Sequence, residues 1–377
     1  MEVEEMFMYF PENRNWSSYF MRLVGEAPQG AADFNECHRV CRRIRDGNEE
    51  DWYMEWRREA EKLEQLASGA EAQAHTVTAH DFYLRAYSYY RAAEFMLQPA
   101  DERKTPAYLL GTECFQRAGR YFRPPLEAVR VPYEETSLHG YFFPNRTGVA
   151  GKTPALVYFG GADSNAEELY FLGAQEALKR GMACLTIDGP GQGETLRLHG
   201  IPSRSDYEVA VRAAVDYLVT RSEVDPDRLG LIGVSMGGYY APRGAAFDPR
   251  IKACVAYGAC FDLLADLYDF FPPIQGQMEW LVGANGPEEA RKKLKEFTLD
   301  GVIDRLSCPL LIVHGEEDYI VAPEAAQKTY DGARGPKELR MWRPDEGGAA
   351  HCNMDNTPQV YPYMFDWLAD RLSGSAG

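Results

Sequence analysis

The residues with the clearest capacity for chemistry are those at 233–237, which read Gly-Val-Ser-Met-Gly and follow the apolar pair Leu-Ile at 231–232. A serine between two such glycines is typical of the sharp turn that joins a strand to a helix and exposes the hydroxyl as a nucleophile. The same pattern also occurs by chance as an ordinary glycine-rich turn. Ser235 is therefore the predicted nucleophile if the chain also supplies its partners.

A serine nucleophile on this kind of turn is followed along the chain by an acid and then by a histidine. The apolar run at 309–315 predicts a buried strand, and three acidic residues come directly after it. We predict that Asp318 is the acid because its distance from the strand is the usual one, with Glu316 and Glu317 as alternatives.

The predicted base is His351, which ends a glycine-rich loop between a last strand at 338–342 and a helix from about 358 to 372. It is the histidine that follows the acid in the expected order. The others are predicted to be structural, and His314 is expected to support the acid loop; the histidines upstream of the serine are His38, His75, His80, His139 and His199.

Acyl chemistry also needs two hydrogen-bond donors where negative charge develops. The backbone amide of Met236, directly after the nucleophile, is one predicted donor. The strand at 155–159 leads into Gly-Gly-Ala-Asp at 160–163, which predicts the second donor as the amide of Gly161, with that of Ala162 as the less favoured alternative.

A further glycine-rich loop, Asp-Gly-Pro-Gly-Gln-Gly-Glu at 188–194, follows a predicted strand. Its spacing matches neither a phosphate-binding loop, which closes with Gly-Lys-Ser/Thr, nor a dinucleotide fingerprint. We interpret it as a turn at the carboxyl end of a sheet strand that shapes the wall of the active-site cleft.

Four motifs together resemble those of the 2,6-dihydroxypseudooxynicotine hydrolase group: residues 188–194, Gly-Gly at 160–161 with Asp163, residues 233–238 and His-Cys-Asn at 351–353. That group is similar to the fungal hydrolases that shorten heptaketide chains in melanin synthesis, and more distantly to the fermentation-respiration switch proteins. The resemblance implies an α/β-hydrolase fold, a homodimer, and cleavage of a carbon–carbon bond beside a carbonyl in 1,3-dicarbonyl or polyketide-like aromatic substrates.

The chain changes character at about residue 125. Residues 1–125 carry helical patterns and predict a helical cap domain, whereas residues 126–377 alternate strands with helices and predict a doubly wound, mostly parallel sheet. An aromatic-rich stretch at 261–299 lacks strand alternation and lies before the acid-bearing strand, so we expect a helical lid insertion there.

Tyr83, Tyr87 and Tyr90 recur at helical spacing within residues 81–95, a segment that resembles the helix placed over the pocket in the related group. They predict either a packed interdomain face or a pocket roof whose hydroxyls bind an aromatic or polyketide-like substrate. Asp262 is a further candidate for binding a substrate hydroxyl or carbonyl.

The composition is that of a globular enzyme without a membrane span. The 377 residues are 45% hydrophobic, yet no apolar stretch approaches the ~20 residues that a span requires. The net charge of -17 disfavours nucleic acid and anionic membranes as partners. The first five residues, Met-Glu-Val-Glu-Glu, are acidic where a secretory signal is basic, so a cytoplasmic location is expected.

No metal or cofactor is predicted. The eight cysteines are scattered and are expected to be reduced, and Cys37 and Cys41 lack the second ligand pair of a zinc site. The predicted function is a serine hydrolase acting on a carbon–carbon bond. An esterase, thioesterase or acyltransferase of biosynthetic intermediates is the alternative, and a non-catalytic binding protein is the third. A route in which His351 activates water directly also remains open.

Overall fold

The computed structural model describes residues 7–145 and 151–373, so the acidic residues at 1–5 lie outside the described part of the chain. The chain forms two compact units, residues 1–127 and 128–377. The predicted domain boundary at about 125 lies close to this division. Each unit is described by itself below.

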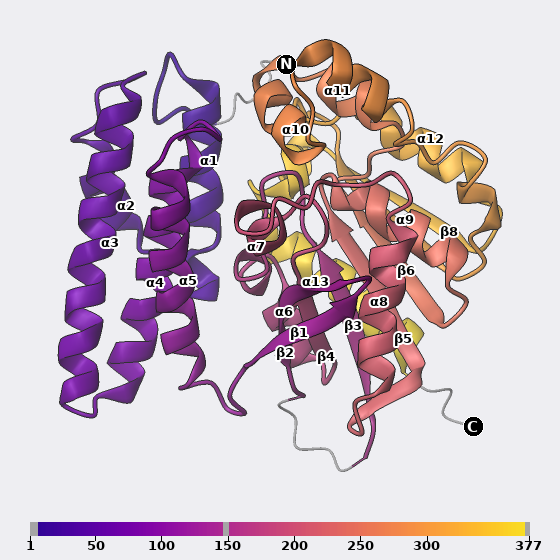
Figure 1. Cartoon of the computed structure of the whole chain (residues 1–377), viewed down its shortest axis with the longest axis horizontal. Coiled ribbons are helices and arrows are strands. Elements are labelled where there is room, and N and C mark those ends of the chain that lie inside the picture. The colour runs from indigo at the N-terminus through magenta and orange to yellow at the C-terminus, as the bar shows by residue number, and fades with distance from the viewer. Residues whose placement is uncertain (1–6, 146–150, 374–377) are drawn as a thin grey trace. The chain divides into compact units, whose positions relative to one another are not determined.

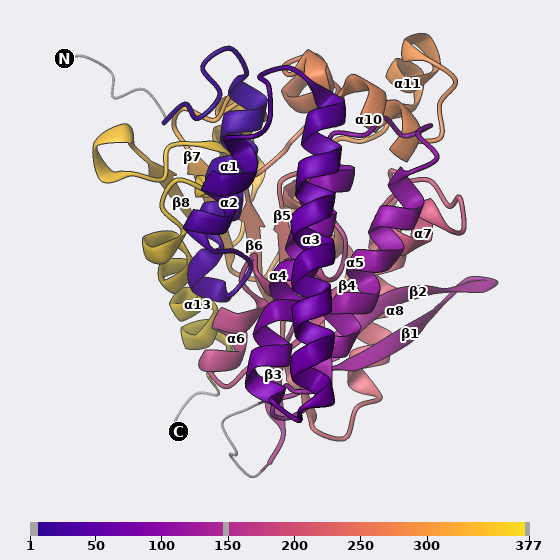
Figure 2. The same ribbon diagram turned by 90° about the vertical axis from the view of Figure 1, so that its left-hand side faces the viewer.

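The described part of the first unit consists of helices and their connections. Figure 1 shows this unit in indigo and violet, and in it α4 packs against both α3 and α5 (Figure 2). Its elements are α1 (Arg14–Gly25), η1 (Ala27–Gln29), α2 (Phe34–Cys41), α3 (Glu49–Ala72), α4 (Thr76–Phe95) and α5 (Lys104–Gly119).

Helix α3 begins where the sequence provides a cap and a favourable charge. The side chain of Asn48 accepts a hydrogen bond from the amide of Asp51, and three acidic residues occupy the first turn, where the helix dipole stabilises negative charge. On the inner face of α3, Trp52 is fully buried and its Nε1 donates to the carbonyl of Ala92 on α4 at 2.8 Å. These contacts join the two long helices.

The second unit is built on one eight-stranded sheet with the order β1-β2-β4-β3-β5-β6-β7-β8. Strand β2 pairs antiparallel with β4, and the pairs from β4 across to β8 are parallel. This is the predicted α/β-hydrolase sheet, so the fold prediction is confirmed. The strands are β1 (Glu127–Tyr133), β2 (Thr136–Phe143), β3 (Thr153–Phe159), β4 (Ala183–Ile187), β5 (Val224–Val234), β6 (Ile251–Tyr257), β7 (Leu310–Gly315) and β8 (Lys337–Trp342).

Helices cover both faces of this sheet, as expected for parallel strands, whose two faces are buried. Helices α8 (Glu208–Val219) and α9 (Gly237–Phe247) pack together over one face, and α6 (Ala174–Lys179) and α13 (Thr357–Leu372) pack together over the other (Figure 1). Strands β4 and β7, which both have neighbours on either side, are buried along their whole length. The other elements beside the sheet are η2 (Glu168–Tyr170), α7 (Gly193–Arg197), η5 (Ile303–Arg305), α12 (Glu324–Gly332), η6 (Pro344–Glu346) and η7 (His351–Asn353).

The predicted helical insertion before the acid-bearing strand is confirmed, because short helices fill the chain between β6 and β7. They are the π-helical η3 (Leu264–Tyr268), η4 (Pro272–Ile274), α10 (Gln275–Leu281) and α11 (Pro287–Leu294). From α10, the side chain of Gln277 donates to the carbonyl of Ala162 at 3.1 Å. The insertion therefore reaches the loop in which the second oxyanion donor is predicted.

The sequence predicts that the eight cysteines are reduced, and it predicts no metal site. All eight cysteines lie in the described ranges as free thiols, and seven of them are buried. Within those ranges, no group of three or more histidine, cysteine, aspartate or glutamate side chains is arranged to hold a metal ion. No helix between residues 7 and 373, outside the gap at 146–150, is long and apolar enough to cross a membrane.

Candidate active site

Ser235 lies at the junction of β5 and α9, on the turn predicted from its flanking glycines. Its backbone has a φ of +58°, a left-handed conformation that non-glycine residues rarely adopt, and its amide donates to the carbonyl of Tyr257 on β6 at 2.7 Å. At the next glycine, a Cβ on Gly237 would lie only 2.7 Å from the carbonyl oxygen of Gly160. The strained turn is held by its neighbours, which is common at reactive residues.

His351 connects the serine to the acid. Its Nε2 lies 3.0 Å from Ser235 Oγ, and its Nδ1 lies 2.6 Å from Asp318 Oδ2. These two contacts assign the proton of the neutral imidazole to Nδ1, which donates to the carboxylate. Nε2 is then free to accept from the serine hydroxyl. That arrangement is the one a general base for Ser235 requires.

Asp318 is fixed from several sides. Its Oδ1 accepts from the amides of Ile320 and Val321, both at 2.9 Å, while Nε2 of His314 lies 3.3 Å from Oδ2. Burial raises the pKa of this carboxyl. His351, His314 and the Val321 amide together lower it by more, so the net pKa lies below its ordinary value. The group therefore stays ionised beside the imidazole.

The two alternative acids do not take part in this chain of hydrogen bonds. Glu316 and Glu317 are exposed, whereas Asp318 is buried. His314, predicted to support the acid loop, is fully buried behind Asp318, and burial lowers its pKa so that it is a neutral donor. Its Nε2 also lies 3.3 Å from the carbonyl of Val321.

The pKa of His351 follows from two opposing effects. Burial, the largest single effect, lowers it, but Asp318 and Cys352 together raise it by more, so the net pKa lies well above the ordinary value for histidine. The imidazolium is thus stabilised by its partner, as a base that must hold a proton during a reaction needs to be.

Cys352 is an additional side chain at the base. Its Sγ lies 3.3 Å from His351 Nε2, the nitrogen that also faces Ser235, and its backbone is left-handed with a φ of +49°. The hydroxyl of Tyr257 donates to the carbonyl of Cys352. The loop that carries His351 is thereby fastened to the end of β6, the same strand that accepts the amide of Ser235.

The amide predicted as the second oxyanion donor already has a hydrogen-bond partner. The amide of Gly161 donates to Ser164 Oγ at 3.0 Å and is therefore engaged inside its own loop. Among the described residues, the amides of Ala162 and Met236 have no hydrogen-bond partner. The geometry therefore favours Ala162, the less favoured alternative from the sequence, as the candidate donor. The sequence could not reveal that Ser164 folds back onto the loop.

The three tyrosines of α4 are placed inside the helical unit. The hydroxyl of Tyr83 donates to Glu71 Oε2 at 3.0 Å, and that of Tyr90 donates to Glu64 Oε2 at 2.6 Å, both on α3. The ring of Tyr87 packs on Phe115 of α5. The hydroxyls of Tyr83 and Tyr90 therefore have partners within their own unit, and the suggested contact of the tyrosines with a substrate is left as a prediction without structural support.

Asp262 is also used locally. Its Oδ1 accepts from the amides of Leu264 and Ala265, each at 3.0 Å, and so fixes the turn that leads into η3. Its amide in turn donates to Asp266 Oδ2 at 2.8 Å. These bonds describe a turn at the start of the insertion, and they give no support to a substrate-binding role.

Comparisons with known proteins identify the family of this chain. The sequence matches the Esterase FrsA-like family over residues 35–271 and the Prolyl oligopeptidase family over residues 169–375. Among curated proteins, it is 32% identical to Hydrolase LUC6 of Fusarium sp and 31% identical to 20-hydroxy-prefusarin hydrolase FUS2 of Gibberella moniliformis. Each match covers 93% of this chain and 94% of the relative.

Among solved structures, the fold is similar to that of the 2,6-dihydroxy-pseudo-oxynicotine hydrolase, with a TM-score of 0.81 and 27% sequence identity. That match covers 93% of this chain and 95% of the other. The resemblance inferred from the four motifs is therefore confirmed. The chain therefore belongs to the α/β-hydrolases, matches both the Esterase FrsA-like and the Prolyl oligopeptidase families, and is a hydrolytic enzyme.

Proposed function

We propose that this protein is a serine hydrolase in which Ser235, His351 and Asp318 act as the catalytic triad. The observation that carries the proposal is the unbroken chain from Ser235 Oγ to His351 Nε2 at 3.0 Å and from His351 Nδ1 to Asp318 Oδ2 at 2.6 Å. A hydroxyl, a base and a buried ionised acid in this order are what nucleophilic acyl chemistry requires.

In the proposed reaction, Ser235 Oγ attacks a substrate carbonyl carbon while His351 Nε2 takes the hydroxyl proton. The negative charge on the carbonyl oxygen is stabilised by the amides of Ala162 and Met236. Collapse of this intermediate breaks the bond to the leaving group, which receives the proton from His351. Water, deprotonated by the same nitrogen, then attacks the acyl-enzyme, releasing the acid and restoring Ser235.

The bond broken is proposed to be a carbon–carbon bond beside a carbonyl, in a 1,3-dicarbonyl or polyketide-like aromatic substrate. The leaving group is then an enolate, which the second carbonyl stabilises until His351 protonates it. The similarity to the 2,6-dihydroxy-pseudo-oxynicotine hydrolase and to 20-hydroxy-prefusarin hydrolase supports this substrate class. The triad and the oxyanion amides alone are equally suited to an ester, because the fold hosts many acyl chemistries.

The test is product analysis by mass spectrometry in oxygen-18 water, with matched panels of aryl 1,3-diketones and aryl esters. The wild type is compared with Ser235→Ala and with Ser222→Ala, which removes an exposed hydroxyl ahead of β5, at the opposite end of that strand from Ser235. Labelled acid from the diketones, lost only in Ser235→Ala, is expected. Acid quenching followed by intact mass measurement detects the acyl-enzyme and separates this route from direct attack by water activated at His351.

An esterase is the second candidate, and the match to the Esterase FrsA-like family over residues 35–271 favours it. The same experiment distinguishes the two, because turnover of the aryl esters without any cleavage of the diketones would contradict carbon–carbon hydrolysis. Transfer of the acyl group to an added alcohol or amine, followed in the same samples, would identify an acyltransferase.

The cellular setting belongs to the same proposal. We propose a small-molecule substrate and a homodimer, which the family resemblance implies, and a cytoplasmic location. The net charge of -17 disfavours nucleic acid and anionic membranes as partners. Light scattering coupled to size exclusion measures the oligomeric state directly, and a mass of one chain in solution would contradict the dimer.

A further inference from the structure

The loop that carries the second oxyanion donor is held by one glutamine. Gln192 comes from the glycine-rich stretch after β4, and its Nε2 donates to the carbonyl of Gly160 at 2.7 Å and to that of Gly161 at 3.1 Å. The side chain is buried, with 3% of its surface exposed. Two successive peptide groups of the loop are thus held by a single side-chain amide.

These two bonds determine where the loop amides point. In a trans peptide the C=O and N–H lie in one plane and face opposite ways. A donor that fixes the carbonyl of Gly161 therefore also fixes the N–H of Ala162, which shares that peptide group. The carbonyl of Gly160 is fixed in the same way, and the N–H of Gly161 in that peptide group donates to Ser164.

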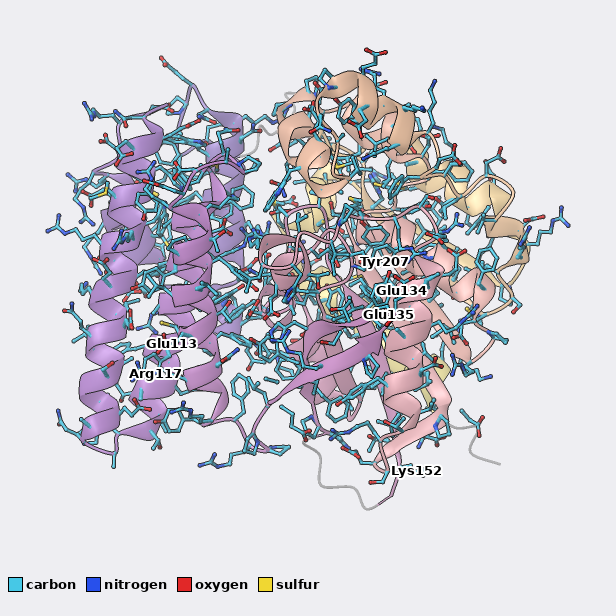
Figure 3. The ribbon with its side chains drawn as sticks, viewed as in Figure 1. Glu113, Arg117, Glu134, Glu135, Lys152 and Tyr207 are labelled. Atoms are coloured by element: carbon cyan, nitrogen blue, oxygen red, sulfur yellow. The ribbon has the colours of Figure 1, made fainter. Side chains whose placement is uncertain are left out.

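Gln192 is itself held in one orientation. Its Oε1 accepts from the amide of Gly189 at 3.2 Å and from the hydroxyl of Tyr207 at 3.0 Å. Tyr207, labelled in Figure 3, is fully buried and its ring stacks on Tyr240 with centroids 3.4 Å apart. Two donors and two acceptor positions of the glutamine are thus used, and a flipped amide would place oxygen against the two loop carbonyls.

The surrounding motif keeps this glutamine in place. The carboxylate of Asp188 accepts from the amide of Ala166 at 2.7 Å and from that of Glu194 at 2.8 Å, so it joins the oxyanion loop to the stretch that contains Gln192. A Cβ at Gly189 would lie 1.9 Å from the Tyr207 hydroxyl oxygen. Residues 188–194 therefore hold the oxyanion loop in place through hydrogen bonds, a role beyond that of shaping the cleft wall.

We propose that Gln192 is a positioning residue that orients the Ala162 amide toward the oxyanion formed at Ser235. The inference rests on the proposed serine hydrolase function and extends it to a residue that touches no reacting atom. Because oxyanion donors stabilise the transition state more than the bound substrate, loss of Gln192 lowers kcat and leaves KM nearly unchanged.

The variant Gln192→Met, of similar length but without donors, tests this with p-nitrophenyl acetate as the probe. Removal of one oxyanion donor typically costs about 10²–10³ in kcat, so a loosened donor is expected to cost about 10–100-fold. Inhibition by 2,2,2-trifluoroacetophenone, which forms a tetrahedral adduct with the serine, should weaken by the same factor. Inhibition by acetophenone, which binds without forming that adduct, should not change.

Two further variants separate positioning from folding. Tyr207→Phe keeps Gln192 but removes one of its anchors, and is expected to give a smaller loss of kcat with the same pattern of inhibition. Gln327→Met, on α12, removes a bond to Asp331 and is the matched control, with wild-type kinetics expected. Thermal unfolding is measured for each variant, and an unfolded Gln192→Met leaves Tyr207→Phe to decide.

The outcomes are distinct. Wild-type kcat in Gln192→Met, or equal weakening of both ketones, overturns the positioning role. A fluorophosphonate probe that fails to label Ser235 in the wild type overturns the proposed function, and the inference falls with it. A selective loss of trifluoroacetophenone affinity in a protein whose Ser235 still labels supports both.

Discussion

Gly161 lies directly against Ser235: a Cβ placed on the glycine would stand 2.9 Å from Ser235 Cβ and 3.2 Å from Ser235 Oγ. The nearer atom belongs to a residue whose turn cannot shift freely, because its amide is bonded to Tyr257 at 2.7 Å. The absence of a side chain at Gly161 therefore leaves room for Ser235, and the Gly161 amide donates to Ser164 Oγ.

We predict that Gly161→Ala lowers kcat by about 100-fold, because a displacement of about 1 Å in a reacting group costs that much. Folding should be preserved, since Gly161 has no positive φ that an alanine would strain. Gly276→Ala, in α10, is the matched control, because a Cβ there meets no atom within 4 Å. Wild-type kcat in Gly161→Ala would refute the close packing.

The second prediction concerns pH. Activity toward p-nitrophenyl acetate should rise with pH, with a midpoint above about 6.5. Asp318 and Cys352 together raise the pKa of His351 by more than burial lowers it, and only the neutral imidazole accepts the serine proton. The raised pKa also stabilises the folded state. That contribution is fully present below the unfolded pKa of about 6.5 and is lost as pH rises through the folded value.

Asp318→Asn should lower the midpoint and reduce kcat by about 10⁴-fold, since an amide neither stabilises the imidazolium nor fixes the tautomer. Asp345→Asn changes an exposed acid in the loop that leads to His351. It is the control and should leave the pH profile unchanged. An unshifted midpoint in Asp318→Asn, measured from kcat/KM between pH 5 and 9, would mean that another group titrates.

The third prediction is that replacing His314 shifts the midpoint of the pH profile upward, opposite to the shift expected for Asp318→Asn. Its neutral Nε2–H lies 3.3 Å from the oxygen of Asp318 that receives His351, and its Nδ1 has no partner among the described residues. His314 Nε2–H bonds to the carbonyl of Val321, and its dipole also lies beside the carboxylate. His314→Leu removes this N–H from beside the carboxylate, which then holds the His351 proton more tightly. The midpoint should rise by about 0.5–1 pH unit, equivalent to about 0.7–1.4 kcal/mol.

His314→Gln keeps an N–H donor and should restore the wild-type midpoint. The comparison uses the same kcat/KM profiles, with thermal unfolding as a check on folding. A downward shift in His314→Leu, or no difference between the leucine and glutamine variants, would contradict an electrostatic effect of the His314 N–H on Asp318.

The sequence alone predicted the sheet, the helical insertion and the meeting of Ser235, Asp318 and His351. Each of these depends on local patterns: apolar strand runs, a Gly-x-Ser-x-Gly turn, and side chains placed directly after strand ends. Because parallel strands end at one edge of the sheet, residues far apart along the chain come together there without any further information.

The sequence did not reveal contacts made across the fold by ordinary polar side chains. The choice between Gly161 and Ala162 depends on the Ser164 hydroxyl and on Gln192, which no periodicity identifies. The face shared by Tyr83 and Tyr90 was visible at helical spacing, but their partners Glu71 and Glu64 lie on α3, and only the pairing of the helices brings them together.

The last prediction concerns Cys352, the one thiol among the eight that is not buried. Burial raises the pKa of other thiols, to about 12 for Cys37 and Cys308, which keeps them protonated and unreactive. N-ethylmaleimide is therefore expected to modify the native protein first at Cys352. The adduct would occupy the space beside His351 Nε2, 3.3 Å from the sulfur, and abolish fluorophosphonate labelling of Ser235.

Cys352→Ser, nearly isosteric, should retain activity and resist inactivation, because it lacks the thiol but keeps the shape of the loop. Peptide mapping locates the adduct, and residual hydrolysis of p-nitrophenyl acetate is followed in parallel. Inactivation of Cys352→Ser at the wild-type rate would place the sensitive group elsewhere. Full modification of Cys352 without loss of activity would mean that the space beside His351 is wide enough for both the adduct and a substrate.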